Sequence, residues 1–209
     1  MMIIITEVIR KKNYYEVHAE NAVYEVDGEL QRLHHIQAGE RFEEDFLLSL
    51  HQKSRFRRAY RRACFLLDDR EYSYCMMYQK LMHTYEDKAL CTSVMEQLVQ
   101  CGAIDDRRYA RKYAEYLAGS KQYGLYRIRQ EMLRKGLDKQ LIEESLRMVE
   151  EITAENLSGV LEKKFGRLLT DPKDFKSREK VIAGMIRLGY DYQSVRNAVE
   201  DYFAEQTED

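Results

Sequence analysis

A short motif that recurs at nearly constant spacing constrains the fold of this chain more than any other feature. An aliphatic residue, two variable residues, a glycine-like position, an aromatic or aliphatic residue and an acid occur in this order three times. The glycine-like positions are Thr84, Gly136 and Gly189, which lie 52 and 53 residues apart. Glycine ends a helix in the left-handed conformation, the next residue fills the corner, and the acid caps the following helix. The recurrence therefore predicts three tandem helical units.

The predicted fold is mainly α-helical, with three three-helix repeats stacked as an elongated, solenoid-like array. We place the repeats at residues 54–101, 102–150 and 151–209, with helices of roughly 12 to 16 residues each. Only 10 glycines and 1 proline occur in 209 residues, which favours helices over sheets punctuated by turns. In the third repeat, Asp171-Pro172 is predicted to cap and start a helix.

Residues 1–53 differ in kind from the repeats. β-Branched and alternating apolar residues over 1–26, interrupted by a turn at 11–13, predict two or three short antiparallel strands. A short helix is predicted from Asp27 to Ile36. Because an isolated hairpin is only marginally stable, this small N-terminal antiparallel sheet is expected to pack on the segment that follows it.

The charge balance and the cysteines limit the cell compartment and the kind of partner. Lys and Arg number 34 against 36 Asp and Glu, so the net charge of −2 gives no general attraction to nucleic acid or anionic membrane. Four cysteines in apolar periodic runs, with no CxxC pair, predict reduced and buried thiols. No apolar stretch approaches the ~20 residues of a membrane span, and the N-terminus lacks the features of a signal peptide. We expect a soluble, cytoplasmic protein.

Charge is nevertheless segregated along the chain. Residues 53–62 carry six bases and no acid, and residues 107–135 carry nine bases and two acids, whereas 1–50 and 138–162 each have a net charge of −5. Arginine makes charge-assisted contacts and tyrosine anchors interfaces, so the basic segments predict a partner-binding surface, although a run of charges is usually only a solvated helix face. The residues predicted for this surface are Arg58, Arg61, Arg62, Arg111, Lys121, Arg127, Arg134 and Lys135.

Four motifs in a fixed order carry a resemblance to a known family. They are LDDREYSYCMMYQKL, starting at Leu67, then GAIDDRRYA, GLYRIRQEMLRKGL and LGYDYQSVRNAV. They resemble the RecX family of bacterial regulatory proteins over about residues 55–203. The strand-rich start and AGERFEEDFL resemble the N-terminal extension found in some members of that family. The chain departs from the family pattern at two positions: Thr84 stands where members usually have glycine, and Leu125 stands where proline is frequent. At these two junctions the local geometry is expected to differ from that of the family.

The resemblance implies a function that the composition does not show. It implies a non-enzymatic negative regulator that binds the RecA recombinase in the groove of the RecA–DNA filament and inhibits its recombinase, ATPase and co-protease activities. Such a protein acts in the regulation of recombination, in DNA repair and in the SOS response. The resemblance also implies tandem three-helix repeats, which agrees with the motif spacing. We expect a monomer that needs no cofactor and does not contact the membrane.

An enzyme is one of three alternatives. The sequence contains no HExxH, Walker loop, dinucleotide-binding glycine pattern or GxSxG. The adjacent pair His34-His35 would point about 100° apart in a helix and suits no common metal. We therefore predict no catalytic residue, no metal ligand and no cofactor-binding residue.

The other two alternatives are a DNA-binding protein and a helical adaptor with another partner. Three-helix units resemble helix-turn-helix modules, but no recognition helix presents its polar residues on one face, so only weak, non-specific DNA contact is expected beside filament binding. The repeats alone permit an adaptor, because a solenoid does not identify its ligand. Capture of RecA from a bacterial lysate would distinguish the adaptor from the RecA regulator.

Overall fold

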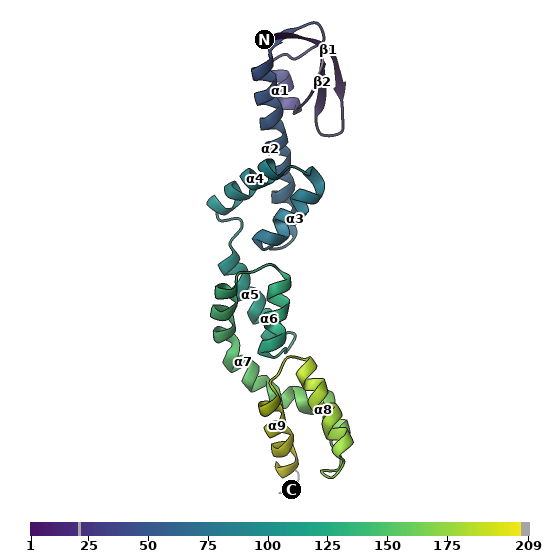
Figure 1. Ribbon diagram of the computed structural model, residues 1–209, viewed down its shortest axis with the longest axis vertical. Helices are drawn as coiled ribbons and strands as arrows, with labels where there is room; N and C mark the ends of the chain where they lie inside the picture. The colour runs from purple at the N-terminus through teal and green to yellow at the C-terminus, as the bar shows by residue number, and fades with distance from the viewer. Residues whose placement is uncertain (21, 206–209) are drawn as a thin grey trace. The chain divides into compact units, whose positions relative to one another are not determined.

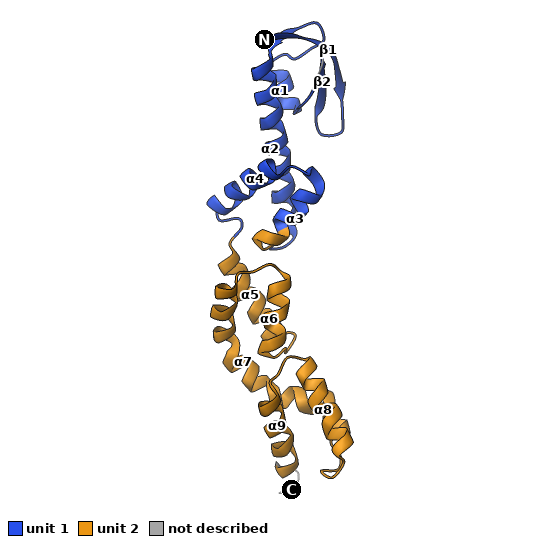
Figure 2. Ribbon diagram, in the orientation of Figure 1, with its two compact units in different colours: residues 1–71, 77–104 blue, residues 72–76, 105–209 orange. Residues whose placement is uncertain are grey.

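The structure is a computed structural model that describes residues 1–20 and 22–205 (Figure 1). The chain forms two compact units (Figure 2). Unit 1 comprises residues 1–71 and 77–104, and unit 2 comprises residues 72–76 and 105–209. The predicted fold class is confirmed, since the chain is mostly helical and has a small antiparallel sheet at its N-terminus.

An antiparallel sheet with strand order β3-β2-β1-β4 begins unit 1. Ile3 and Ile5 are buried whereas Ile4 is exposed, which is the alternation of a half-buried strand. The sequence did not signal β4, because three residues that pair with the start of β1 carry too little pattern of their own. The strands are β1 (Met2–Arg10), β2 (Tyr15–Ala19), β3 (Ala22–Val26) and β4 (Arg41–Glu43).

The sheet shares one core with helices α1 (Gly28–Leu33) and α2 (Glu44–Asp69). Asp27 caps α1, as predicted, by accepting two backbone N–H groups of that helix. The N–H of the buried Asp27 donates to Ser54 Oγ of α2 at 2.9 Å. Leu47 of α2 is fully buried against the sheet, so the N-terminal strands pack on the following helix as expected.

The other helices follow one another with short connections. They are α3 (Tyr74–Tyr85), α4 (Lys88–Gln100), α5 (Asp106–Gly119), α6 (Leu125–Arg134), α7 (Lys139–Phe165), α8 (Phe175–Arg187) and α9 (Tyr192–Glu205), with a 3-10 turn η1 at Gly166–Leu168. Within residues 1–20 and 22–205, no helix has both the length and the apolar character needed to cross a bilayer.

Two helices are about twice as long as expected. The 26 residues of α2 run through position 53/54 and the 27 residues of α7 run through 150/151, so both of these expected repeat boundaries lie inside a helix. No proline interrupts α7, and its single glycine, Gly159, has open space around it, so nothing ends the helix there.

The recurring motif forms the predicted junctions in unit 2. Gly136 and Gly189 have φ values of 72° and 96°, in the left-handed region. The next residue, Leu137 or Tyr190, is buried, and its N–H donates to the carbonyl five residues earlier at 3.4 and 3.3 Å. This is the Schellman arrangement. Asp138 then caps α7 and Asp191 accepts the N–H of Ser194 at the start of α9.

Two predicted caps were wrong. The left-handed residue before α4 is Glu86, with φ 50°, and the cap is Asp87, because Thr84 remains in α3 and donates its hydroxyl to the Lys80 carbonyl. A β-branched residue such as threonine resists the left-handed conformation. The cap of α8 is Asp174, whereas the preceding Asp171-Pro172 forms a separate turn.

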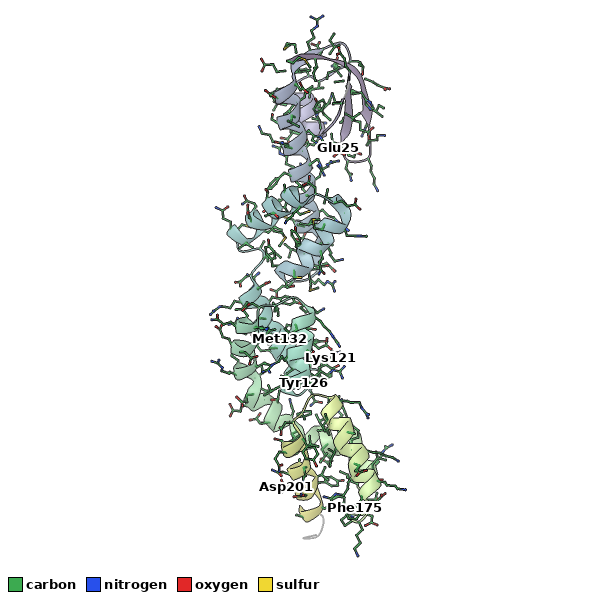
Figure 3. All side chains as sticks on the ribbon, viewed as in Figure 1. Glu25, Lys121, Tyr126, Met132, Phe175 and Asp201 are labelled. Carbon is green, nitrogen blue, oxygen red and sulfur yellow. The ribbon has the colours of Figure 1, made fainter. Side chains whose placement is uncertain are left out.

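The cysteines also differ from the expectation. Only Cys91 is buried, Cys64 and Cys75 are half-buried, and Cys101 is exposed. None of these four cysteines forms a disulfide in the structure. The core between α5, α6 and α7 is formed by other apolar side chains instead. Ile128, Met132 (labelled in Figure 3) and Ile142 are fully buried there.

Two glycines of unit 2 touch through their backbones. Gly124 lies against Gly189, and a Cβ on either residue would overlap main-chain atoms. The Gly124 N–H donates to the Leu188 carbonyl at 2.9 Å, and the Tyr126 N–H donates to the Gly189 carbonyl at 3.1 Å. These bonds join the start of α6 to the junction between α8 and α9.

A histidine of α2 is bound to the sheet through its unprotonated nitrogen. His51 Nδ1 accepts the backbone N–H of Glu25 in β3 at 2.8 Å. Burial lowers the pKa of His51, and the charges of Arg55 and Arg58 lower it further. The carboxylates of Glu25 and Asp87 act in the opposite direction without reversing the shift. The fold therefore favours neutral His51.

We expect Gly124→Ala to lower the free energy of unfolding of unit 2 by about 1–3 kcal/mol, because the new methyl group would force two backbones apart. Urea denaturation followed by circular dichroism measures the change. Gly119→Ala is the matched control, since Gly119 lies at the end of α5 with nothing within 4 Å. Equal stability of the two variants would contradict the close approach.

The contact of His51 predicts a loss of stability in mild acid. Because its pKa is lower in the folded protein, its contribution is complete above the unfolded-state pKa of about 6.5 and is lost as the pH falls. The urea midpoint should decrease from about pH 7.5 to about pH 5.5, and less so in His51→Gln, which keeps an acceptor without titrating there. The same pH dependence in both proteins would refute this role of His51.

Candidate functional site

Three tyrosines of α5 form a stack along one face of the helix. Asp105 caps α5 by accepting the N–H of Arg108, which fixes where the helix starts. Tyr109, Tyr113 and Tyr116 then fall at spacings of four and three residues, so they share a face. Their ring centroids are 5.7 Å apart for the first pair and 6.5 Å for the second, with interplanar angles of 28° and 19°.

Two lysines complete this stack from neighbouring segments. Lys135, at the end of α6, places its Nζ 5.6 Å from the centre of the Tyr113 ring. Lys121, which is labelled in Figure 3, lies in the loop between α5 and α6. Its Nζ is 5.5 Å from the centre of the Tyr116 ring. A cation over an aromatic face is attracted by the ring quadrupole. We call this set, with Arg127 and Arg134 described next, the tyrosine–cation face.

Two arginines of α6 complete the set. The Arg127 guanidinium lies 4.2 Å from the centre of the Tyr123 ring and also donates to the Arg187 carbonyl at 3.1 Å. Arg134 pairs with Glu131 at 2.9 Å while its side chain stays 71% exposed. Arg127 therefore has a structural contact as well, whereas Arg134 is accessible to a partner.

Within the tyrosine–cation face, the surroundings keep Lys121 charged and the Tyr113 hydroxyl neutral. The Tyr116 hydroxyl, by hydrogen bonding to Lys121, raises the pKa of that ammonium. Burial, followed by the charge of Glu131, raises the pKa of Tyr113. The face thus presents positive charge beside uncharged aromatic rings, an arrangement suited to docking against an acidic or phosphate-bearing partner.

The structure brings together four of the five cations predicted in this region and leaves one out. Lys121 and Lys135 lie over the rings of Tyr116 and Tyr113, Arg127 lies over Tyr123 and Arg134 pairs with Glu131. Arg111 is exposed about 200° around α5 from Tyr109. The charge pattern of the sequence predicts a basic surface here, but it does not show that Lys121 and Lys135 lie over tyrosine rings. The contacts join separate segments, and no local pattern signals such pairing.

The predicted cations of unit 1 have unequal roles. Arg58 is only 14% exposed, pairs with Glu25 of β3 and lies 4.1 Å from the centre of the Tyr14 ring. Arg61 and Arg62, one turn further along α2, are exposed. The sequence could not separate the buried arginine from the exposed ones, because its partners lie 33 and 44 positions earlier in the chain.

Across 1–20 and 22–205, no three histidine, cysteine, aspartate or glutamate side chains gather as the ligands of a metal ion. The arrangement found instead, rings and cations on the outer face of a helical unit, suits non-covalent binding.

The tyrosine–cation face lies in the part of the chain that matches a family model. Residues 105–146 match the model described as RecX, second three-helix domain. The regulatory protein RecX of Chlorobium phaeobacteroides (strain BS1) is 31% identical over 147 residues, covering 70% of this chain and 95% of that protein. The regulatory protein RecX of Serratia proteamaculans (strain 568) is 32% identical over 116 residues, covering 56% of this chain and 67% of that protein.

Two solved structures share the fold. A crystal structure of regulatory protein RecX matches with a TM-score of 0.69 at 20% identity, covering 95% of this chain and 99% of that one. RecX from Lactobacillus salivarius matches with a TM-score of 0.64 at 18% identity, covering 70% of this chain and 96% of that one. Because the sequence match spans nearly the full length of a RecX protein and the fold agrees with it, the chain belongs to the RecX family of regulatory proteins.

Proposed function

We propose that this protein is a negative regulator of the RecA recombinase, acts in the cytoplasm and has no catalytic activity of its own. Membership of the RecX family, carried by the match over 70% of the chain, is the observation on which the proposal depends. The tyrosine–cation face supports it, because aromatic rings and arginines are common anchors of protein interfaces. The partner surface is the groove of the RecA–DNA filament, where acidic protein and DNA phosphates attract cations.

Inhibition of this kind needs no chemistry. A helical protein bound in the groove obstructs the second DNA strand during recombination and a substrate of the co-protease activity. It also restrains the relative movement of neighbouring RecA protomers. Obstruction alone accounts for the loss of strand exchange and of co-protease activity.

Inhibition of ATP turnover requires one further property. A ligand shifts a conformational equilibrium only by its difference in affinity for the two states. The protein should therefore bind active and inactive filaments with different affinities, which can be measured on filaments assembled with a non-hydrolysable ATP analogue and with ADP. Equal affinities would exclude this route to ATPase inhibition and leave obstruction in place.

We expect Lys121→Glu/Arg134→Glu/Lys135→Glu to weaken binding to RecA-coated single-stranded DNA by at least about tenfold, because three cations of the tyrosine–cation face become acids. Inhibition of strand exchange should require correspondingly more protein. Fluorescence anisotropy of labelled RecA filaments at physiological salt measures the affinity.

The matched control reverses three exposed cations elsewhere in unit 2, at Lys163, Lys164 and Lys180. It makes the same change in net charge and should bind the filament nearly as well as the unaltered protein. Equal weakening by both triple variants would show a general charge effect and reject the tyrosine–cation face as the contact.

The DNA-binding alternative is tested by the same titration on DNA without RecA. The proposed regulator prefers RecA-coated over naked single-stranded DNA at physiological salt, whereas a DNA-binding protein would bind the naked strand at least as well. An unaltered chain that leaves RecA filaments unbound and strand exchange unaffected would overturn the proposed function itself.

A further inference from the structure

Unit 1 contains a hollow of about 900 Å³ whose lining is strongly basic. It lies between the turn that joins β1 to β2, strand β3, helix α2 and the end of α3. One carboxylate, that of Glu25 (Figure 3), faces a surplus of cations there. The cations are Lys12, Arg55, Arg58, Arg61 and Arg62.

Two of these arginines hold the walls of the hollow. Arg58 pairs with Glu25 and covers the ring of Tyr14, which ties the hairpin turn to α2. Arg55 pairs with Asp87 at 2.8 Å and donates to the Tyr85 carbonyl at 3.5 Å, which ties the end of α3 to α2. The charges of these two side chains are thus compensated within the fold, and their positions are fixed.

The other three cations have no such compensation. Among the residues that the structure describes, no carboxylate pairs with Lys12, Arg61 or Arg62, and all three are exposed. Like charges gathered around one hollow repel one another, and the repulsion is relieved when an anion binds between them. The surplus therefore indicates an anionic ligand.

The charges of two of the arginines also act on Tyr85, a tyrosine that lines the hollow. Burial raises the pKa of Tyr85, while the charges of Arg58 and Arg62 act on the same hydroxyl in the opposite direction. Arg58 and Arg62, one helical turn apart on α2, are therefore both close enough to the Tyr85 hydroxyl for their charges to oppose the rise in its pKa. Arginine presents a planar fork of donors that matches phosphate oxygens, which favours phosphate over other anions.

Size and shape favour a compact ligand over a strand of nucleic acid. A volume of about 900 Å³ falls within the range of small-molecule and cofactor sites. Single-stranded nucleic acid is usually bound by a groove that follows its backbone. Here the hairpin turn bounds the hollow on one side and the end of α3 bounds it on another.

We propose that this hollow binds a compact polyphosphate, namely the triphosphate group presented by inorganic tripolyphosphate or by a nucleoside triphosphate. Lys12, Arg61 and Arg62 supply the positive charge for its oxygens, and Arg55 and Arg58 hold the walls. The proposal is independent of the proposed function, since it requires neither RecA nor the tyrosine–cation face.

Isothermal titration calorimetry of the full chain, alone in magnesium-free buffer, tests the site with ATP, tripolyphosphate and a short oligothymidylate. We expect saturable binding of ATP and tripolyphosphate that weakens as salt is added. Equal affinities would show that the triphosphate alone is recognised, and tighter binding of ATP would show a further contact with the nucleoside; both support the site. Failure of both compounds to bind, or binding of the oligothymidylate alone, would overturn it.

We expect Arg61→Glu/Arg62→Glu to weaken binding by at least about tenfold, because two charge-assisted contacts become repulsive. Lys163→Glu/Lys164→Glu, which reverses an exposed pair in unit 2, should retain the affinity. If circular dichroism shows that the first variant is unfolded, Arg61→Gln/Arg62→Gln replaces it and should also bind more weakly. Unchanged affinity in a folded variant, or equal loss in the control, would contradict the assignment.

Discussion

The fold of unit 2 depends on how two of its helices, α6 and α8, end. At Gly136 and again at Gly189 the backbone turns left-handed, and the next residue both fills the corner and returns its N–H to the helix that has just ended. Carbonyl groups that would otherwise lose their partners at the helix terminus are thereby satisfied, and an aspartate two residues after the glycine starts the next helix. These two turns set the course of the chain from α6 into α7 and from α8 into α9.

The parts of the fold that are encoded locally were predictable. The junctions of unit 2 and the cap Asp27 each need only a few consecutive residues, and the structure confirms them. The first junction was misplaced because the motif there lacks its glycine, and Glu86 takes the left-handed conformation two residues later than the motif places it. The length of α7 was missed because continuation of a helix is signalled only by the absence of a stop.

The candidate surface was predictable in composition and not in arrangement. Counting charges identified the basic segments, but it could not show that Lys121 and Lys135 lie over tyrosine rings, or that Arg111 lies away from them. Likewise, Arg58 and Arg61 belong to one run of bases, yet the first is bound to a strand and a ring while the second is exposed. Which arginine builds the fold and which one faces a ligand depends on contacts between segments distant in the chain.

The backbone contact between Gly124 and Gly189 has a consequence for divergence within the family. The two hydrogen bonds between these backbones do not depend on the identity of the surrounding side chains. Two further bonds do, since the Arg127 guanidinium donates to the Arg187 carbonyl and the Tyr190 hydroxyl donates to the Gln122 carbonyl. A joint made of main-chain atoms needs only the space that two glycines provide. Such a construction is compatible with a shared fold at 20% identity, because hydrogen bonds between main-chain atoms tolerate change in most of the side chains around them.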